Sequence, residues 1–283
     1  MHGKINNQVT LSENGFEKRF ISPDKDINYE REFAFYQWCM EKKLTQVPRL
    51  LNFKQEEKKL VLEYVDGKSH QVINNNTLVQ IGDFLRDLNQ FGDPSELPLA
   101  GESICSIKDL SNHIQRRWQD IGNKGKYDTN GLSDKVLEIL FTLNEHYFDI
   151  GKLIANPSDL GLHNIIEKGQ QLIFIDFEYA GYDSQLKCLM DFCLHPANNL
   201  PLNSIQPINQ IFAKALKTNP LVIPEFVIRA FCLWWILRIL KSISEEVIEN
   251  RVVTGVLSPR QKKAYIEQRH EQYKYFWDIV RFN

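Results

Sequence analysis

The chain has 283 residues, of which 43% are apolar and 25% charged, an ordinary globular composition with room for one large domain or two lobes. Its formal net charge of −2 provides no field that would attract nucleic acid or an anionic membrane, so the sequence argues against both as partners. The five irregularly spaced cysteines form no CxxC pair, which predicts reduced thiols, and no N-terminal stretch is apolar enough for a signal peptide. We expect a soluble cytoplasmic protein and assign no oligomeric state.

The first 66 residues predict strands around one helix. Two strands, 8–11 and 15–21, are joined by the turn signal SENG, and Phe16, Lys18 and Phe20 alternate so that they share one face of the second strand. Apolar residues at helical spacing predict a helix over 28–43. A second hairpin follows, with strands in 47–53 and 59–65 around the charged turn KQEEKK.

After the segment DGKS, at 66–69, helical periodicity dominates. The exception is a predicted hairpin over 164–176, which ends in the apolar run LIFID. The sequence therefore predicts an α+β fold with a small β-rich N-terminal lobe, residues 1–66, and a larger mainly helical C-terminal lobe, residues 67–283. Ligands favour such lobe junctions. The predicted helices of the second lobe are 76–92, 106–121, 133–149, 204–217, 224–243 and 259–280.

Two acids and an amide lie in NPSDLGLHNIIEKGQQLIFIDFEYAG, residues 156–181. Asn164 and Asp176 supply the oxygen ligands that Mg²⁺ prefers, and Asp159 on the same loop remains available to orient a hydroxyl or accept its proton. Asp-x4-Asn followed by an aspartate at a strand end is the arrangement of a kinase catalytic loop. The alternative is structural, since Asp159, Asn164 and Asp176 could each cap a turn.

A kinase also needs a strand lysine on the nucleotide phosphates and a helix glutamate that holds this lysine. Lys18 and Glu32 have the required order and spacing. Arg19 and Glu30, one and two positions away, are rival candidates. The segment Glu63, Tyr64 and Val65 would offer backbone groups to adenine.

The combined string SDLGLHN, LIFIDFEYAGYD and DF resembles the aminoglycoside phosphotransferase and choline kinase group of small-molecule kinases. This resemblance implies a protein-kinase-like fold with ATP and Mg²⁺ as cofactors. It assigns Asp159 as the catalytic aspartate, Asn164 and Asp176 as metal ligands, and Asp191 as a residue that braces the loop. Members often carry G-x-x-NN near the N-terminus, which implies that Asn6 and Asn7 cover the phosphates together with the backbone.

Three of the departures of the catalytic loop from the family string His-Gly-Asp-Leu-His-Pro-Gly-Asn bear on its function. Pro157 replaces the first histidine, Ser158 the glycine, and Gly161 the second histidine. Pro157 cannot donate a side-chain hydrogen bond, so support for the loop must come from elsewhere. His163 beside Asn164 is interpreted as a loop-packing residue, and Gly3 is the sole glycine of the N-terminal nucleotide loop.

The acceptor hydroxyl must lie within reach of Asp159. Glu178, Tyr179 and Asp183 follow the metal strand and are candidate substrate contacts. Aromatic residues of the C-terminal helices could form a cage for a quaternary ammonium group, but their helical spacing favours a role in the core. These aromatic residues are Trp234, Trp235, Tyr273, Tyr275, Phe276 and Trp277.

The sequence therefore predicts an enzyme that moves the γ-phosphoryl group of ATP, with Mg²⁺, to a hydroxyl of a small metabolite. Choline or ethanolamine and aminoglycoside antibiotics are the alternative acceptors. A hypothesis of a different class is a nucleotide-binding pseudokinase that acts as a scaffold, which Pro157 and the short N-terminal loop favour.

Overall fold

The computed structural model describes the whole chain except residues 1–6, 13–14, 91, 123–130, 254–255 and 283. The chain divides into two compact units. The first unit comprises Gly3–Ser103 and Gly151–Leu221, and the second comprises Ile104–Ile150 and Val222–Asn283. The small N-terminal antiparallel sheet and the mainly helical C-terminal part confirm the predicted α+β class. The predicted lobe boundary at residue 66 stays a prediction.

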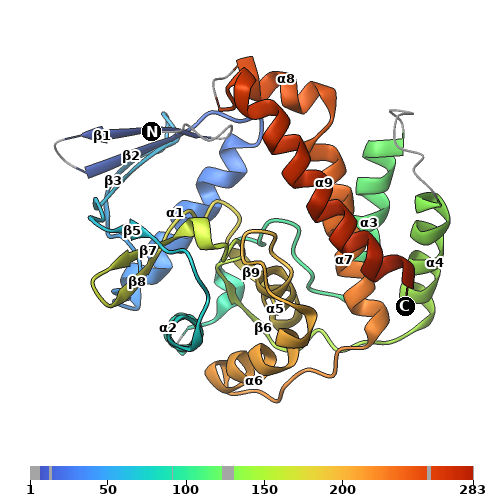
Figure 1. The fold of residues 1–283 in the computed structure, drawn as a ribbon. Coiled ribbons are helices and arrows are strands. Elements are labelled where there is room, and N and C mark those ends of the chain that lie inside the picture. The colour runs from blue at the N-terminus through green and yellow to red at the C-terminus, as the bar shows by residue number, and fades with distance from the viewer. Residues whose placement is uncertain (1–6, 13–14, 91, 123–130, 254–255, 283) are drawn as a thin grey trace. The chain divides into compact units, whose positions relative to one another are not determined.

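The first unit opens with the sheet β1-β2-β4-β3, all antiparallel, with helix α1 beside it (Figure 1). Its remaining strands form the sheets β5-β7-β8 and β6-β9, which accompany helices α2, α5 and α6. Both predicted N-terminal hairpins are confirmed, although Asn14 of the first turn lies outside the described residues. The elements of this unit are β1 (Asn7–Ser12), β2 (Gly15–Phe20), α1 (Lys25–Glu41), β3 (Leu50–Lys54), β4 (Lys59–Leu62), β5 (Lys68–Ser69), α2 (Asn75–Asn89), β6 (Leu153–Asn156), β7 (Ile165–Lys168), β8 (Gln171–Phe174), β9 (Gly181–Ser184), α5 (Gln185–Cys193) and α6 (Ile205–Leu216).

Four phenylalanines form the core between α1, α2 and the end of β8. Phe174 stacks on Phe84 of α2, with ring centroids 4.4 Å apart, and Phe177 packs 4.6 Å from Phe35 of α1. All four are almost completely buried, and burial of such rings contributes roughly 1.5–3 kcal/mol each. The segment that carries Asp176 is thereby fixed on both sides.

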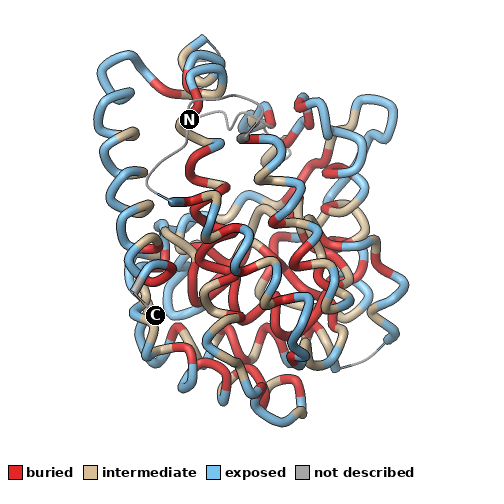
Figure 2. The backbone as a smooth tube through the Cα atoms, turned by 90° about the vertical axis from the view of Figure 1, so that its right-hand side faces the viewer, coloured by how far each residue is buried: buried red, intermediate tan, exposed pale blue. Residues whose placement is uncertain are grey.

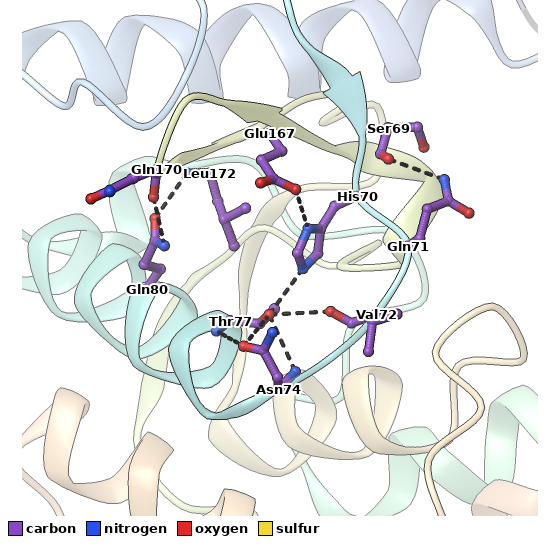
Figure 3. Close-up of polar contacts among 10 residues, drawn as sticks. All are labelled: Ser69, His70, Gln71, Val72, Asn74, Thr77, Gln80, Glu167, Gln170 and Leu172. Carbon is purple, nitrogen blue, oxygen red and sulfur yellow. Dashed lines mark hydrogen bonds and ion pairs between the residues drawn. The ribbon is translucent and has the colours of Figure 1, made fainter.

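The hairpin β7–β8 is fastened to the segment that leads into α2 (Figure 3). His70 lies between Glu167 of β7 and Thr77 of α2, with Nε2 2.9 Å from the threonine hydroxyl. The amide of Gln80 accepts a hydrogen bond from the Leu172 backbone at 2.8 Å and donates to the Gln170 carbonyl. These contacts set the position of the hairpin.

The second unit consists of helices. Its central helix, α7, contacts α3, α4, α8 and α9 and buries most of its length, including Trp234 at 0% exposure. No helix in the described ranges is long and apolar enough to span a bilayer. The helices are α3 (Ile107–Gly122), α4 (Leu132–Glu145), α7 (Glu225–Ser242), α8 (Glu245–Val253) and α9 (Pro259–Phe282).

The predicted helices of both units are confirmed to within a few residues. Figure 2 shows buried positions alternating with exposed ones along the backbone, which is the pattern that made these helices recognisable. The strands β6 and β9 were not predicted. Each has four residues and a partner distant in sequence, so neither presents a clear alternation to a local reading.

The contribution of the Gln80 side chain to holding the β7–β8 hairpin can be tested by measuring the stability of a variant. Gln80→Ala removes two hydrogen bonds to the β7–β8 hairpin, and we expect a loss of about 1–2 kcal/mol in the free energy of unfolding. Urea denaturation measures this loss. Gln71→Ala is the matched control, since this exposed side chain bonds to the carbonyl of Ser69 two residues away, and an equal loss in both variants would contradict the assignment.

Candidate active site

A buried lysine joins three parts of the first unit. Lys18 of β2 is 4% exposed and Glu32 of α1 is 0% exposed, and the two side chains form an ion pair. Lys18 Nζ also lies 2.7 Å from Asp176 Oδ1. The rivals Arg19 and Glu30 are both exposed. The structure therefore brings together Lys18, Glu32 and Asp176, which the sequence singled out as the phosphate lysine, the helix glutamate and a metal ligand.

The β7–β8 hairpin brings Asn164 and Asp176 together. Asn164 immediately precedes β7, and Asp176 follows β8 by one residue. Ile165 pairs with Phe174, and the Ile175 backbone N–H donates to the Asn164 carbonyl at 3.0 Å. The register of one short hairpin thus places the two predicted metal ligands at its open end.

Asp176 and Ser158 both adopt left-handed backbone conformations, with φ of 69° and 61°. Such values are uncommon outside glycine and accumulate at functional sites. Asp176 is held there by the buried rings of Phe174 and Phe177 on its two sides. At Ser158, the backbone N–H donates to Asn156 Oδ1 at 2.9 Å, which closes an Asx-type turn just before Asp159.

Three asparagines hold the loop that carries Asp159. Asn156 joins β6 to β9 through Asp183 Oδ2, at 3.1 Å. Asn164 Nδ2 donates to the Asp159 backbone carbonyl at 3.0 Å. The side-chain oxygen Oδ1 of Asn164 is therefore the atom that would ligate the predicted metal. Asn198, after α5, accepts from the Leu162 N–H and donates to the Leu160 carbonyl. These bonds replace the support that Pro157 cannot give.

Two histidines face the Asp159 carboxylate. Nε2 of His195 lies 3.1 Å from Asp159 Oδ1, and Nε2 of His163 lies 3.7 Å from Oδ2. Burial alone would raise the pKa of Asp159, but the interactions with His163 and His195 outweigh it and hold that pKa well below its usual range. Asp159 is therefore a carboxylate at neutral pH. The same three side chains form a group that could hold a metal ion.

The remaining predicted contacts lie in this unit. Asn7 is 1% exposed and donates to Glu178 Oε2 at 2.7 Å, while Gly3 and Asn6 lie outside the described residues. Tyr179 packs beside the backbone at Gly101 and accepts a hydrogen bond from its N–H. Asp183 is 0% exposed and accepts from the Ser184 N–H in addition to Asn156. Substrate contacts by Glu178, Tyr179 and Asp183 stay predictions.

The predicted adenine segment follows β4. Leu62 pairs with Phe16, two residues from Lys18, so Glu63, Tyr64 and Val65 leave the sheet near the lysine. The Glu63 N–H donates to the Arg49 carbonyl, and a side-chain hydrogen bond from Arg49 lowers the pKa of Glu63. The side chain of Tyr64 is exposed. Adenine contact by the backbone of Glu63, Tyr64 and Val65 stays a prediction.

Sequence reasoning missed His195 and Asn198, and it assigned the loop brace to Asp191. The partner recorded for Asp191 is Lys187, one turn earlier on α5. Asn198 makes the contacts with the loop instead. A local reading had no signal for either residue, because both contacts join segments about 36 residues apart.

No protein-family model and no curated protein sequence matches the chain. Solved structures do. A choline/ethanolamine kinase family protein from Mesorhizobium loti matches with TM-score 0.61 and 16% identity, over 99% of this chain and 91% of its own. The gentamicin–APH(2″)-IIa complex matches with TM-score 0.63 and 14% identity, over 96% and 92%. Choline kinase LicA from Streptococcus pneumoniae matches with TM-score 0.59 and 15% identity, over 98% and 90%.

The chain has the fold of these small-molecule kinases. The predicted protein-kinase-like architecture is confirmed, and the resemblance read from residues 156–192 is supported over nearly the full length. At identities this low, the likeness establishes the fold.

The left-handed backbone at Ser158 gives a stability prediction. Glycine adopts positive φ freely, whereas an L-residue does so at a cost of about 1–2 kcal/mol. Ser158→Gly should therefore raise the free energy of unfolding by about 0.5–1 kcal/mol, after the extra chain entropy of glycine is deducted. Ser204→Gly, at a φ of −76°, should lower it. Urea denaturation of both variants checks the sign, and destabilisation by Ser158→Gly would refute the strain argument.

Proposed function

We propose that the chain is an ATP- and Mg²⁺-dependent kinase that transfers the γ-phosphoryl group to a hydroxyl of a small metabolite. The observation that carries the proposal is the position of Lys18 between Glu32 and Asp176, with Asn164 across the hairpin from Asp176. A lysine with a helix glutamate and a metal aspartate is the set that phosphoryl transfer requires. Solved structures of this fold include complexes with ADP and spectinomycin and with ATP and streptomycin.

The donor set suits Mg²⁺, which prefers one or two carboxylates together with other oxygens. Asn164 and Asp176 would hold the ion, and Lys18, fixed by Glu32, would hold the α- and β-phosphates. Bound Mg²⁺ would neutralise charge on the phosphates. We assign phosphate contact also to Asn7 with the neighbouring backbone, and adenine contact to the backbone of Glu63, Tyr64 and Val65.

Asp159 would accept a hydrogen bond from the acceptor hydroxyl. Its depressed pKa makes it a weak base but an always-charged hydrogen-bond acceptor. We therefore assign it mainly the orientation of the hydroxyl, in keeping with a reaction catalysed by positioning and charge. Glu178, Tyr179 and Asp183 are the proposed residues on the acceptor side.

The acceptor itself is assigned no further than a small hydroxyl compound. A choline-type cage built on the tryptophans of α7 gains no support, since the guanidinium of Arg238 lies 4.5 Å from the Trp235 ring and 5.7 Å from that of Trp234. These rings already have a cation from the chain itself. Phe276 is also buried, as the helical spacing favoured.

A scaffold without catalysis is the weaker hypothesis. Lys18 and Glu32 are buried charges, and burial of charged groups opposes folding unless each is paired. A scaffold could use apolar residues at these positions at lower cost. A kinase needs the charges themselves.

The roles of the acids are tested by nucleotide turnover and binding. Wild-type protein with Mg²⁺-ATP should show slow ATP hydrolysis even without an acceptor, because water can take the acceptor's place. Asp159→Asn should lower this turnover by ~10²–10⁴-fold while ATP still binds, and Asp176→Ala should abolish the dependence of ATP affinity on Mg²⁺. Calorimetry with and without Mg²⁺ measures the affinity.

Two results would count against the proposal. Near-normal turnover in Asp159→Asn would remove that residue from the reaction. Wild-type protein that binds no Mg²⁺-ATP at millimolar concentration would exclude the kinase function, whereas binding without turnover across a broad panel of hydroxyl metabolites would favour the scaffold.

The proposed phosphate contact of Lys18 can be tested with the neighbouring Arg19 as the control. Lys18→Ala should weaken ATP affinity, since it removes the buried cation between Glu32 and Asp176. Arg19→Ala removes an exposed cation from the same strand, and we expect little effect. Calorimetric titration of both variants with Mg²⁺-ATP tests this, and a larger loss in Arg19→Ala would move the role to the neighbour.

A further inference from the structure

Asp159 Oδ1 is enclosed by protein, and it makes no hydrogen bond of standard geometry with the described residues. A buried carboxylate oxygen needs a donor, because its desolvation is otherwise uncompensated. The side chain recorded opposite this oxygen is His195, whose Nε2 lies 3.1 Å away. The His195 side chain is 14% exposed, so it too is largely shielded from water.

The backbone fixes which nitrogen of His195 carries the proton. The Ala197 N–H donates to His195 Nδ1 at 3.1 Å. A nitrogen that accepts a hydrogen bond has its lone pair free and carries no proton, so in the neutral imidazole the proton lies on Nε2. Nε2 is therefore the protonated ring nitrogen, and it lies 3.1 Å from the carboxylate oxygen that lacks a donor.

The segment that carries His195 is tied to the catalytic loop at several points. Asn198, three residues later, is 5% exposed and bonds to the Leu160 carbonyl, the Phe192 carbonyl and the Leu162 N–H. Its own N–H donates to the His195 carbonyl at 2.9 Å. The histidine and the loop are thus held as one piece.

Gly161 provides the space that the arrangement needs. A Cβ atom at this position would come within 2.5 Å of the His163 ring and 2.7 Å of the His195 ring. The glycine has a φ of −77°, which any residue adopts, so its role here is clearance for the two imidazoles. The ring centroids of His163 and His195 are 5.3 Å apart.

We infer that His195 is the positioning residue of Asp159: it donates Nε2–H to Oδ1 and so directs Oδ2 to the acceptor hydroxyl. The inference rests on the proposed kinase function for its catalytic meaning. His195 itself touches no reacting atom in this role. It stabilises one rotamer of the carboxylate, and turnover then depends on how well that rotamer is maintained.

A transition-metal site is the competing use of the same side chains. Ligand atoms of Asp159, His163 and His195 all lie within 4.8 Å of one another, and two imidazoles with a carboxylate suit zinc. Metal binding at Nε2 of His195 would move the proton to Nδ1 and break the hydrogen bond from Ala197. The local backbone therefore favours the hydrogen-bond donor.

The kinetic test compares side chains that differ in where they place a donor. The amide nitrogen of glutamine can stand near the position of Nε2, whereas that of asparagine corresponds to Nδ1. His195→Ala and His195→Asn should lower kcat for ATP turnover about 10- to 100-fold with little change in KM for ATP, and His195→Gln should restore most of it. His270→Ala, an exposed histidine of α9, should leave turnover unchanged.

Wild-type turnover in His195→Ala, or equal kcat in the glutamine and asparagine variants, would overturn the inference. So would a rise in KM for ATP with kcat unchanged. Should His195→Ala fail to fold by thermal melting, the glutamine and asparagine pair still decides, since both keep a polar side chain.

A second readout does not depend on turnover. Long-range ¹H–¹⁵N NMR of histidine-labelled protein should show the Nε2–H tautomer for His195, and the Nδ1–H tautomer would overturn the inference. Calorimetric one-to-one binding of Zn²⁺ alone, lost in His195→Ala, would overturn it in favour of a metal site. If wild-type protein shows the Nε2–H tautomer but no ATP turnover, the kinase proposal fails while the hydrogen bond between His195 and Asp159 is supported.

Discussion

The buried charge of Lys18 is the constraint on which the first unit depends. A lysine that is 4% exposed is costly to keep charged unless acids surround it, and Glu32 and Asp176 do so from a helix and from the end of a hairpin. The ion pairs therefore fix β2, α1 and the segment after β8 to one another. Loss of Lys18 would remove the cation that the two acids share, so geometry and stability are coupled at this point.

Much of this arrangement was predictable because it follows from local patterns. Alternation along β2 placed Lys18 on the face shared with Phe20, and Glu32 follows it on the predicted helix in the order and at the spacing that a kinase needs. Exposure then separates these residues from Arg19 and Glu30. Asn164 and Asp176 were predictable for a similar reason, since a hairpin with a four-residue register determines which residues meet at its open end.

The support of Asp159 was not predictable in the same way. His195 and Asn198 reach the loop across more than 30 residues of sequence, and nothing in their own neighbourhood marks them. Strands β6 and β9 were not predicted for the same reason, because each forms by pairing with a strand distant in sequence and shows no clear alternation of its own. Asp183 illustrates the consequence: no local pattern predicted that it accepts hydrogen bonds from the Asn156 side chain and the Ser184 N–H.

The departures from the family's loop string at Pro157, Ser158 and Gly161 fit together in the structure. Where Pro157 cannot bond, Asn156 and Asn198 do. Ser158 keeps the left-handed conformation that a glycine would take. Gly161 gives room to two imidazoles that face the carboxylate. A loop that had merely lost its function would have no physical reason to hold a strained residue and a buried carboxylate between two histidines, since the strain and the burial each cost stability. The set is better explained as a different way to hold Asp159 in a working position.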